Sequence, residues 1–201
     1  MKTLRNSKFA ICVCAIISLC LGGICIAQTR AQQDPLAQTE SETLYHIAEF
    51  VEWPEAASRP GATFNFCVLG LDPLGSSLDE AVLSHPIGEK PTMILRASRI
   101  GDLISCNILF ISSSETARLP KILSKLRNKS IVTVSESPDF AASGGIIQLL
   151  RSGDRINLLI NVDAAQRAGL RLRAQLLSLA RIVHDDEFLS SAGGPRSREI
   201  Q

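Results

Sequence analysis

The sequence is poor in the side chains and motifs that most catalytic and metal sites need. It has three histidines, His46, His85 and His184, which lie far apart without a second ligand at metal-binding spacing. It has no Gly-x-Ser-x-Gly motif, so no serine stands in the strand–turn–helix context that exposes a nucleophile. The acidic run at residues 184–187 could hold a cation, but a polar exit after the last helix is the simpler interpretation. We expect no catalytic residues, no metal, no cofactor and no enzyme activity.

The sequence also lacks an excess of positive charge. The chain has 21 lysines and arginines against 20 aspartates and glutamates. Without residues 1–27 the balance is 18 to 20, which is close to minus two. A protein that binds nucleic acid concentrates positive charge, so this composition excludes that class of partner. The remaining length of about 170 residues suits one domain with its own hydrophobic core.

Residues 1–27 have the organisation of a signal peptide. Basic residues come first, an apolar run follows from residue 9 to residue 26, and the small Ala27 ends the segment. An uncleaved anchor is the alternative, because the run is almost long enough to span a bilayer. Leu19 and Ile24 precede Cys20 and Cys25, where a lipoprotein signal needs a small residue, so we do not expect lipidation. The segment predicts that the protein leaves the cytoplasm.

Cysteine is scarce outside this signal. Four of the six cysteines lie within residues 1–27, and only Cys67 and Cys106 remain in the mature chain. An oxidising compartment favours joining such a pair. The two residues also lie in or beside neighbouring predicted strands. We predict a structural disulfide between them, with two separate buried thiols as the alternative.

Apolar strands alternate with amphipathic helices through the first part of the domain. Apolar residues at helical spacing predict a first helix that begins near Thr43 and ends at Trp53-Pro54. Further helices are expected at 74–83 and 117–126. Strands are expected at 64–69, 93–96, 107–111 and 131–134. Strands that are apolar on both faces indicate a parallel sheet covered by helices on both sides. The fold class is therefore a three-layer α/β domain.

The second part of the domain has a different pattern. Two apolar runs, 145–150 and 155–161, are joined by a polar turn and predict an antiparallel hairpin at one edge of the sheet. Helices are expected at 162–168 and 174–183, separated by Gly169. One buried stripe is expected over the second helix and the residue pair before it, formed by Leu172, Leu176, Leu179, Ala180 and Val183. We assign the domain to residues 41–187, with flexible polar tails at 28–40 and 188–201.

One loop and one group of side chains are candidate binding sites. The loop at residues 70–77 follows a strand and opens a helix, where small ligands commonly bind in α/β sheets. It has no phosphate-binding lysine, and a simple turn is the alternative explanation of Gly70, Asp72, Gly75 and Ser76. The C-terminal helices carry a basic side, and the only tryptophan ends the first helix. We therefore consider four residues as candidates for binding a partner: Trp53, Arg167, Arg171 and Arg173. The alternatives are that Trp53 packs in the core and that the arginines form a solvated helix face.

Several stretches together resemble one protein family. Residues 44–54 (LYHIAEFVEWP) resemble the opening signature of the YfiR/HmsC-like periplasmic proteins, and residues 66–73 resemble their first strand and loop. Residues 144–146, 161–170 and 175–180 resemble the later blocks. The resemblance spans roughly residues 42–184 with the order and spacing retained. A second cysteine pair, present in some members, is absent from this chain.

The resemblance implies a regulatory function in the periplasm. The best understood members bind the periplasmic sensor region of a membrane-anchored diguanylate cyclase and hold the enzyme inactive, which lowers cyclic di-GMP and biofilm formation. The implied partner is such a cyclase or another membrane sensor protein. A small-ligand sensor that is read by a membrane receptor is the alternative function. The sequence is compatible with a homodimer and with a bound small molecule, and it does not decide either point.

The first testable prediction is cleavage of the signal. We expect the mature chain to start near Gln28, because Ala27 provides a small residue at the cleavage position. The intact mass of the exported protein measures this directly. A membrane-bound species that retains residues 1–26 would contradict the prediction.

Overall fold

The computed structural model describes residues 34–55, 62–84, 86–88, 90–103, 105–153 and 155–185. The predicted signal peptide, the first part of the predicted N-terminal tail and the predicted C-terminal tail lie outside these residues. Within the described ranges, no helix has the length and hydrophobicity needed to cross a membrane.

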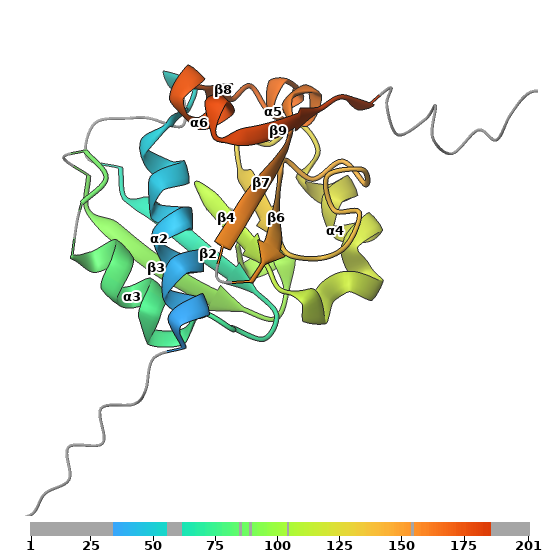
Figure 1. Ribbon diagram of the computed structural model, residues 1–201. Helices are drawn as coiled ribbons and strands as arrows, with labels where there is room; N and C mark the ends of the chain where they lie inside the picture. Colours follow the sequence, from blue (N-terminus) through green and yellow to red (C-terminus); the bar gives the residue numbers. More distant parts are fainter. Residues whose placement is uncertain are drawn as a thin grey trace, which may run out of the picture. The chain divides into compact units, whose positions relative to one another are not determined.

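A seven-stranded mixed sheet organises the domain in the order β3-β2-β4-β5-β6-β7-β9 (Figure 1). Neighbouring strands run parallel throughout, except that β6 and β7 form an antiparallel pair. The predicted α/β class, the parallel sheet and the antiparallel hairpin are confirmed, but the hairpin is not at the edge of the sheet, because β9 pairs with β7 on its outer side. The strands are β2 (Phe64–Leu69), β3 (Thr92–Ala97), β4 (Ile108–Ile111), β5 (Val132–Ser135), β6 (Ile147–Ser152), β7 (Arg155–Asn161) and β9 (Ala180–Val183).

Helices cover both faces of this sheet because the central strands are apolar on both sides. On β2, Phe66 faces one hydrophobic cluster and Cys67 faces the other, as the two-residue period of a strand requires. The first cluster contains residues of α2 (Pro35–Glu49), α3 (Gly75–Leu83), α5 (Val162–Arg167) and α6 (Ala174–Ser178). The second contains α4 (Leu119–Leu126), which follows the 3₁₀ helix η3 (Ser113–Arg118). A shorter 3₁₀ helix, η2 (Ile100–Asp102), lies between β3 and β4.

The first helix is longer at its start than the sequence predicted. It begins at Pro35 rather than near Thr43, and Asp34 caps it by accepting a hydrogen bond from the Leu36 amide at 3.0 Å. Proline suits the first helical turn, which has amides without intrahelical partners, and aspartate suits the cap. Ala37 and Glu40 are buried. The prediction of a flexible tail through residue 40 is therefore wrong for residues 35–40.

The chain after this helix also differs from the prediction. The helix ends at Glu49, and β1 (Val51–Glu52) pairs antiparallel with β8 (Arg171–Leu172) in a separate two-stranded sheet. Helical spacing through Val51 suggested continuation to Trp53, but strand pairing with a distant segment replaces the last turn. No local pattern predicts this pairing, since its partners are about 120 residues apart along the chain.

The single helix predicted over residues 174–183 is also wrong. Helix α6 ends at Ser178, and β9 then runs parallel to β7 with Ile182 opposite Ile160. Ile182 and Val183 are β-branched and suit a strand. Leu179, predicted to lie in a buried stripe, is 73% exposed at the junction. Strand β9 thus forms the sheet edge next to the predicted hairpin.

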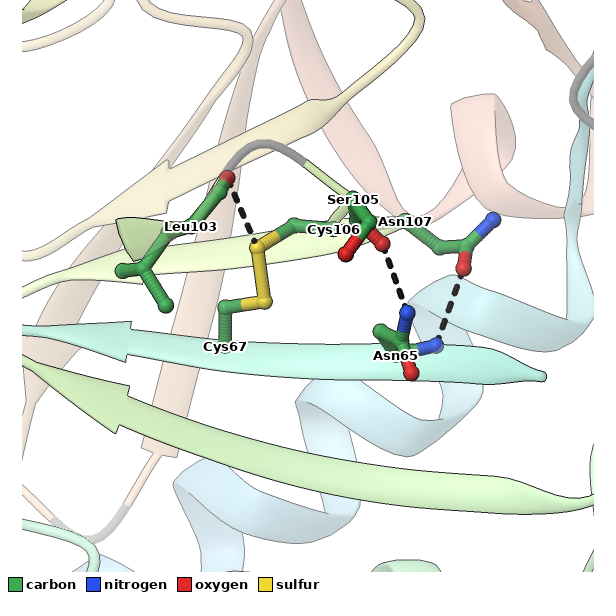
Figure 2. The surroundings of a disulfide bond; sticks show 6 residues. All are labelled: Asn65, Cys67, Leu103, Ser105, Cys106 and Asn107. Carbon is green, nitrogen blue, oxygen red and sulfur yellow. Dashed lines mark hydrogen bonds between the residues drawn. A yellow bond between two sulfur atoms is a disulfide. The ribbon is translucent and has the colours of Figure 1, made fainter. Parts of the chain in front are cut away.

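The predicted disulfide between Cys67 and Cys106 is confirmed (Figure 2). It joins β2 to the residue pair before β4, with a Cα–Cα distance of 5.9 Å, and both cysteines are buried. Two hydrogen bonds lie beside it. The Asn65 amide donates to Asn107 Oδ1 at 2.9 Å, and Asn65 Nδ2 donates to the Ser105 carbonyl at 2.7 Å. The bridge therefore holds the end of the β3–β4 connection against β2.

Removing this bridge should destabilise the domain substantially. The cysteines are 39 residues apart, and closing a loop of that length contributes about 4 kcal/mol in the chain-entropy treatment. We expect the Cys67→Ala/Cys106→Ala variant to lose about this much unfolding free energy in urea titrations. Wild-type protein treated with reductant is the control and should lose a similar amount. Alkylation of both cysteines in the denatured, unreduced protein would contradict the bridge.

Candidate functional site

The predicted ligand loop after β2 is tightly enclosed at its first residue. Gly70 has a positive φ of 94°, and a Cβ built on it would lie 2.5 Å from Ser114 Oγ and 2.8 Å from Glu115 Cγ. The Leu71 amide donates to Ser114 Oγ at 3.0 Å. Gly70 is thus required by its backbone conformation and by the close approach of η3.

Asp72 in this loop already has partners for both carboxylate oxygens. Oδ1 accepts from the Leu74 and Gly75 amides at 2.8 and 3.1 Å, and Oδ2 accepts from Arg96 Nε at 2.6 Å. Arg96 also binds Asp79 and the Gly75 carbonyl. An internal carboxylate therefore occupies the helix N-terminus where a ligand anion would bind. Ser76 is exposed, and none of the four candidates lines any of the five described cavities, so ligand binding here stays a prediction.

Three of the partner-binding candidates lie around the small β1–β8 sheet. Glu52 pairs with Arg171 in the register, and Arg173 Nε donates to Glu52 Oε1 at 3.1 Å. The Trp53 ring packs edge-on against Phe64 with centroids 5.2 Å apart, and the indole is half-buried. Trp53 Nε1 is buried without a hydrogen-bond acceptor among the described residues. A cavity of about 480 Å³ is lined by residues that include Trp53, Phe64, Lys90 and Arg173.

Arg167 belongs to a different cluster. It lies on α5 and forms an ion pair with Asp185, which also accepts from Asn161 Nδ2 at 2.9 Å. The Asp163 carboxylate accepts a hydrogen bond from the Asp185 amide at 2.9 Å and lies 3.1 Å from His184 Nδ1. The backbone hydrogen bond from Asp185, followed by the contact with His184, lowers the pKa of Asp163. The contacts tie the chain after β9 to α5. In the described part of the chain, no group of three or more potential ligands could hold a metal ion.

The sequence analysis missed a buried acidic side chain on α2. Glu40 is 1% exposed, and Arg151 donates to its Oε1 through Nε at 2.7 Å. Arg151 Nη2 lies 2.6 Å from Glu136 Oε2, so one guanidinium serves two carboxylates. Burial raises the pKa of Glu40 to about 7, and the charge of Glu136 adds to the effect while Arg151 opposes it. The Asp34-Pro35 cap would have placed Glu40 on a helix, but its partners are distant in sequence: Arg151 lies on β6 and Glu136 directly follows β5.

The fold and these clusters define an α/β domain with a small two-stranded sheet beside the main one. The profile of the YfiR/HmsC-like family matches residues 37–181, and the chain belongs to this family. Its members are known as periplasmic regulators of diguanylate cyclases and the family is regulatory rather than catalytic. No curated protein matches the chain.

The Glu40 cluster predicts a pH-dependent stability. The folded-state pKa of about 7 lies above the ordinary glutamate value of 4.5, so the folded protein binds the proton on Glu40 more tightly than the unfolded chain does. The stabilisation is complete below about pH 4.5 and is lost as the pH rises through 7. We expect the unfolding free energy of the wild type relative to Glu40→Gln to fall between about pH 5 and about pH 8, by up to about 3 kcal/mol.

Urea titrations across this pH range measure the difference. Glu42→Gln is the matched control, because Glu42 is exposed on the same helix and bonds only to Gln38 in the described structure. Its pH profile should follow the wild type. Parallel profiles for the wild type and Glu40→Gln would show that Glu40 does not titrate in this range.

Proposed function

We propose that the protein is a periplasmic repressor of a membrane-anchored diguanylate cyclase, and that it acts by binding the sensor region of the cyclase. Membership of the YfiR/HmsC-like family is the observation that carries this proposal. The predicted signal peptide and the buried disulfide support an oxidising location outside the cytoplasm. A protein that binds one conformation of a membrane sensor more tightly than the other shifts its population, and differential affinity of a few kcal/mol is sufficient.

The β1–β8 sheet and its surroundings are the surface we assign to the partner. Arg171 and Arg173 are both exposed; Arg171 lies on β8, and Arg173 follows β8 at the N-terminus of α6. Glu52 binds Arg173, while Arg171 has no ion-pair partner among the described residues. Trp53 provides a half-buried aromatic surface beside them. The surface therefore suits an acidic or polar segment of the sensor.

A genetic experiment tests the function. Deleting the gene should raise cyclic di-GMP and surface attachment, because the cyclase is released. Additional inactivation of the partner cyclase should cancel the rise, which separates repression from indirect effects. The purified mature protein should also retain the cyclase from solubilised membranes. If cyclic di-GMP is unchanged and no cyclase is retained, the repressor function fails and the small-ligand sensor takes its place.

Charge reversal tests the assigned surface. Arg173 and Glu52 are about half exposed, at 51% and 48%, and exposed ion pairs contribute little to stability. We therefore expect Arg171→Glu/Arg173→Glu to weaken cyclase binding at least about tenfold while the unfolding free energy changes by less than about 1 kcal/mol. Surface plasmon resonance at two salt concentrations measures the affinity of the wild type and of the double variant for the cyclase sensor region.

The matched control is Arg155→Glu/Arg181→Glu, which reverses two exposed charges on β7 and β9. Neither residue has an ion-pair partner in the described structure, and both lie outside the β1–β8 sheet. This variant should bind the cyclase like the wild type. Equal losses in both double variants would assign the effect to net charge and would remove the surface from the proposal.

A further inference from the structure

A groove with a cationic end and an apolar end lies along α4. Two hollows of about 510 and 180 Å³ adjoin there and share Ile100, Gly101 and Lys125. One wall is formed by η3 and α4, and the other by the β3–β4 connection around η2. We name this feature the α4 groove. It contains none of the candidate residues that the sequence analysis identified.

The larger hollow carries a net positive charge. Its lining has four basic residues, Arg99, Arg118, Lys121 and Lys125, against two acidic residues, Asp102 and Glu115. Both carboxylates already form ion pairs with arginines of the same lining. Arg99 Nε lies 3.1 Å from Asp102 Oδ2, and Arg118 forms an ion pair with the buried Glu115.

Two lysines remain available for a ligand. Within the residues that the structure describes, the side chains of Lys121 and Lys125 have no hydrogen bond or ion pair. They are one helical turn apart on α4, so both ammonium groups extend from the same side of the helix into the hollow. Two adjacent cations without counter-charges favour a carboxylate or phosphate group.

The smaller hollow, where the groove continues, has a mostly apolar lining to which Lys125 and Lys129 also contribute. Its lining includes Leu103, Leu126 and Ile131, which are 1%, 8% and 5% exposed and belong to the core cluster on this face of the sheet. Ile100 lies at the junction of the two hollows. A ligand that fills both would carry its negative group at the lysines and a short apolar chain against these residues.

The groove also starts at the place where α/β sheets commonly bind ligands. Leu69, the last residue of β2, and Ser98, the first after β3, line the cationic hollow at the carboxyl ends of the parallel strands. Ser114 and Glu115 of η3, which follows β4, pack directly against Gly70 after β2. The hollow at the carboxyl end of β2 is lined on one side by α4.

We propose that the α4 groove binds a small amphipathic anion, a carboxylate or phosphate with a short apolar chain. Lys121 and Lys125 bind the anionic group, and Leu103, Leu126 and Ile131 contact the chain. The β3–β4 connection that forms one wall ends at Cys106, which is bridged to Cys67 on β2 (Figure 2). The disulfide thus holds this wall in place, and its reduction weakens ligand affinity.

Titration of the mature, oxidised protein with defined probes tests the site. The probes are hexyl phosphate, hexanoate, inorganic phosphate and neutral 1-hexanol, and binding is followed by calorimetry and by backbone amide NMR shifts. We expect saturable binding of hexyl phosphate or hexanoate, with the largest shifts between residues 98 and 131. Inorganic phosphate should bind more weakly, and hexanol should not shift the amides of Lys121 and Lys125. The better of the two organic anions identifies the charged group.

Paired variants separate the site from general charge effects. Lys121→Gln/Lys125→Gln should weaken binding at least about tenfold, because two charge-assisted hydrogen bonds are lost. Arg155→Gln/Arg181→Gln removes the same charge elsewhere and should leave affinity unchanged. Absence of saturable binding by every anion, equal binding of hexanol, or equal losses in the two double variants would each overturn the proposal. No cyclase is present in these titrations, so their outcome is independent of the repressor function.

Discussion

The burial of β2 on both faces and along both edges is the constraint on which the rest of the structure depends. Its backbone pairs with β3 and β4, so the strand has no free edge. Its side chains alternate between the two core clusters, which obliges α2 and α3 to cover one face and α4 the other. Cys67 attaches the β3–β4 connection to the same strand. Both cores and one wall of the α4 groove are therefore positioned by a single six-residue segment.

Strong local patterns predicted most of this framework from the sequence. The strand predicted at 107–111 has an uninterrupted apolar run from Ile108 to Ile111, so both of its faces are apolar. The hairpin has a polar turn between two apolar runs. Both patterns indicate the type of element without tertiary information. The cysteine pair could be predicted because only two cysteines remain after the signal. These features depend on residues close in sequence or on simple elimination, which is why they could be recognised.

The errors arose where distant pairing or a single cap decides the structure. Ile182 and Val183 form a strand because β7 lies beside them, whereas the spacing of Leu176, Leu179, Ala180 and Val183 is also helical. The start of α2 depends on Asp34 and Pro35 in a segment that is otherwise polar. The contacts of the candidate site were the least predictable feature, because the Arg173–Glu52 ion pair and the Glu40–Arg151 contact join residues more than 100 positions apart. Propensity and periodicity contain no information about such contacts.

The basic residues divide into classes that the sequence does not distinguish. Arg96, Arg118, Arg151 and Arg167 bind carboxylates that the fold places beside them, so their charges are largely used within the domain. Lys121, Lys125 and Arg171 have no such counter-charge in the described structure, although they are equally basic. An unpaired cation on a folded surface gains more from an incoming anion than a paired one, because no internal bond must be broken. Arg155 and Arg181 are also unpaired in the described structure, but they line none of the described hollows. The β1–β8 sheet and the α4 groove each combine an unpaired cation with a neighbouring hollow, and the two surfaces share no residue, so we propose them as the recognition surfaces.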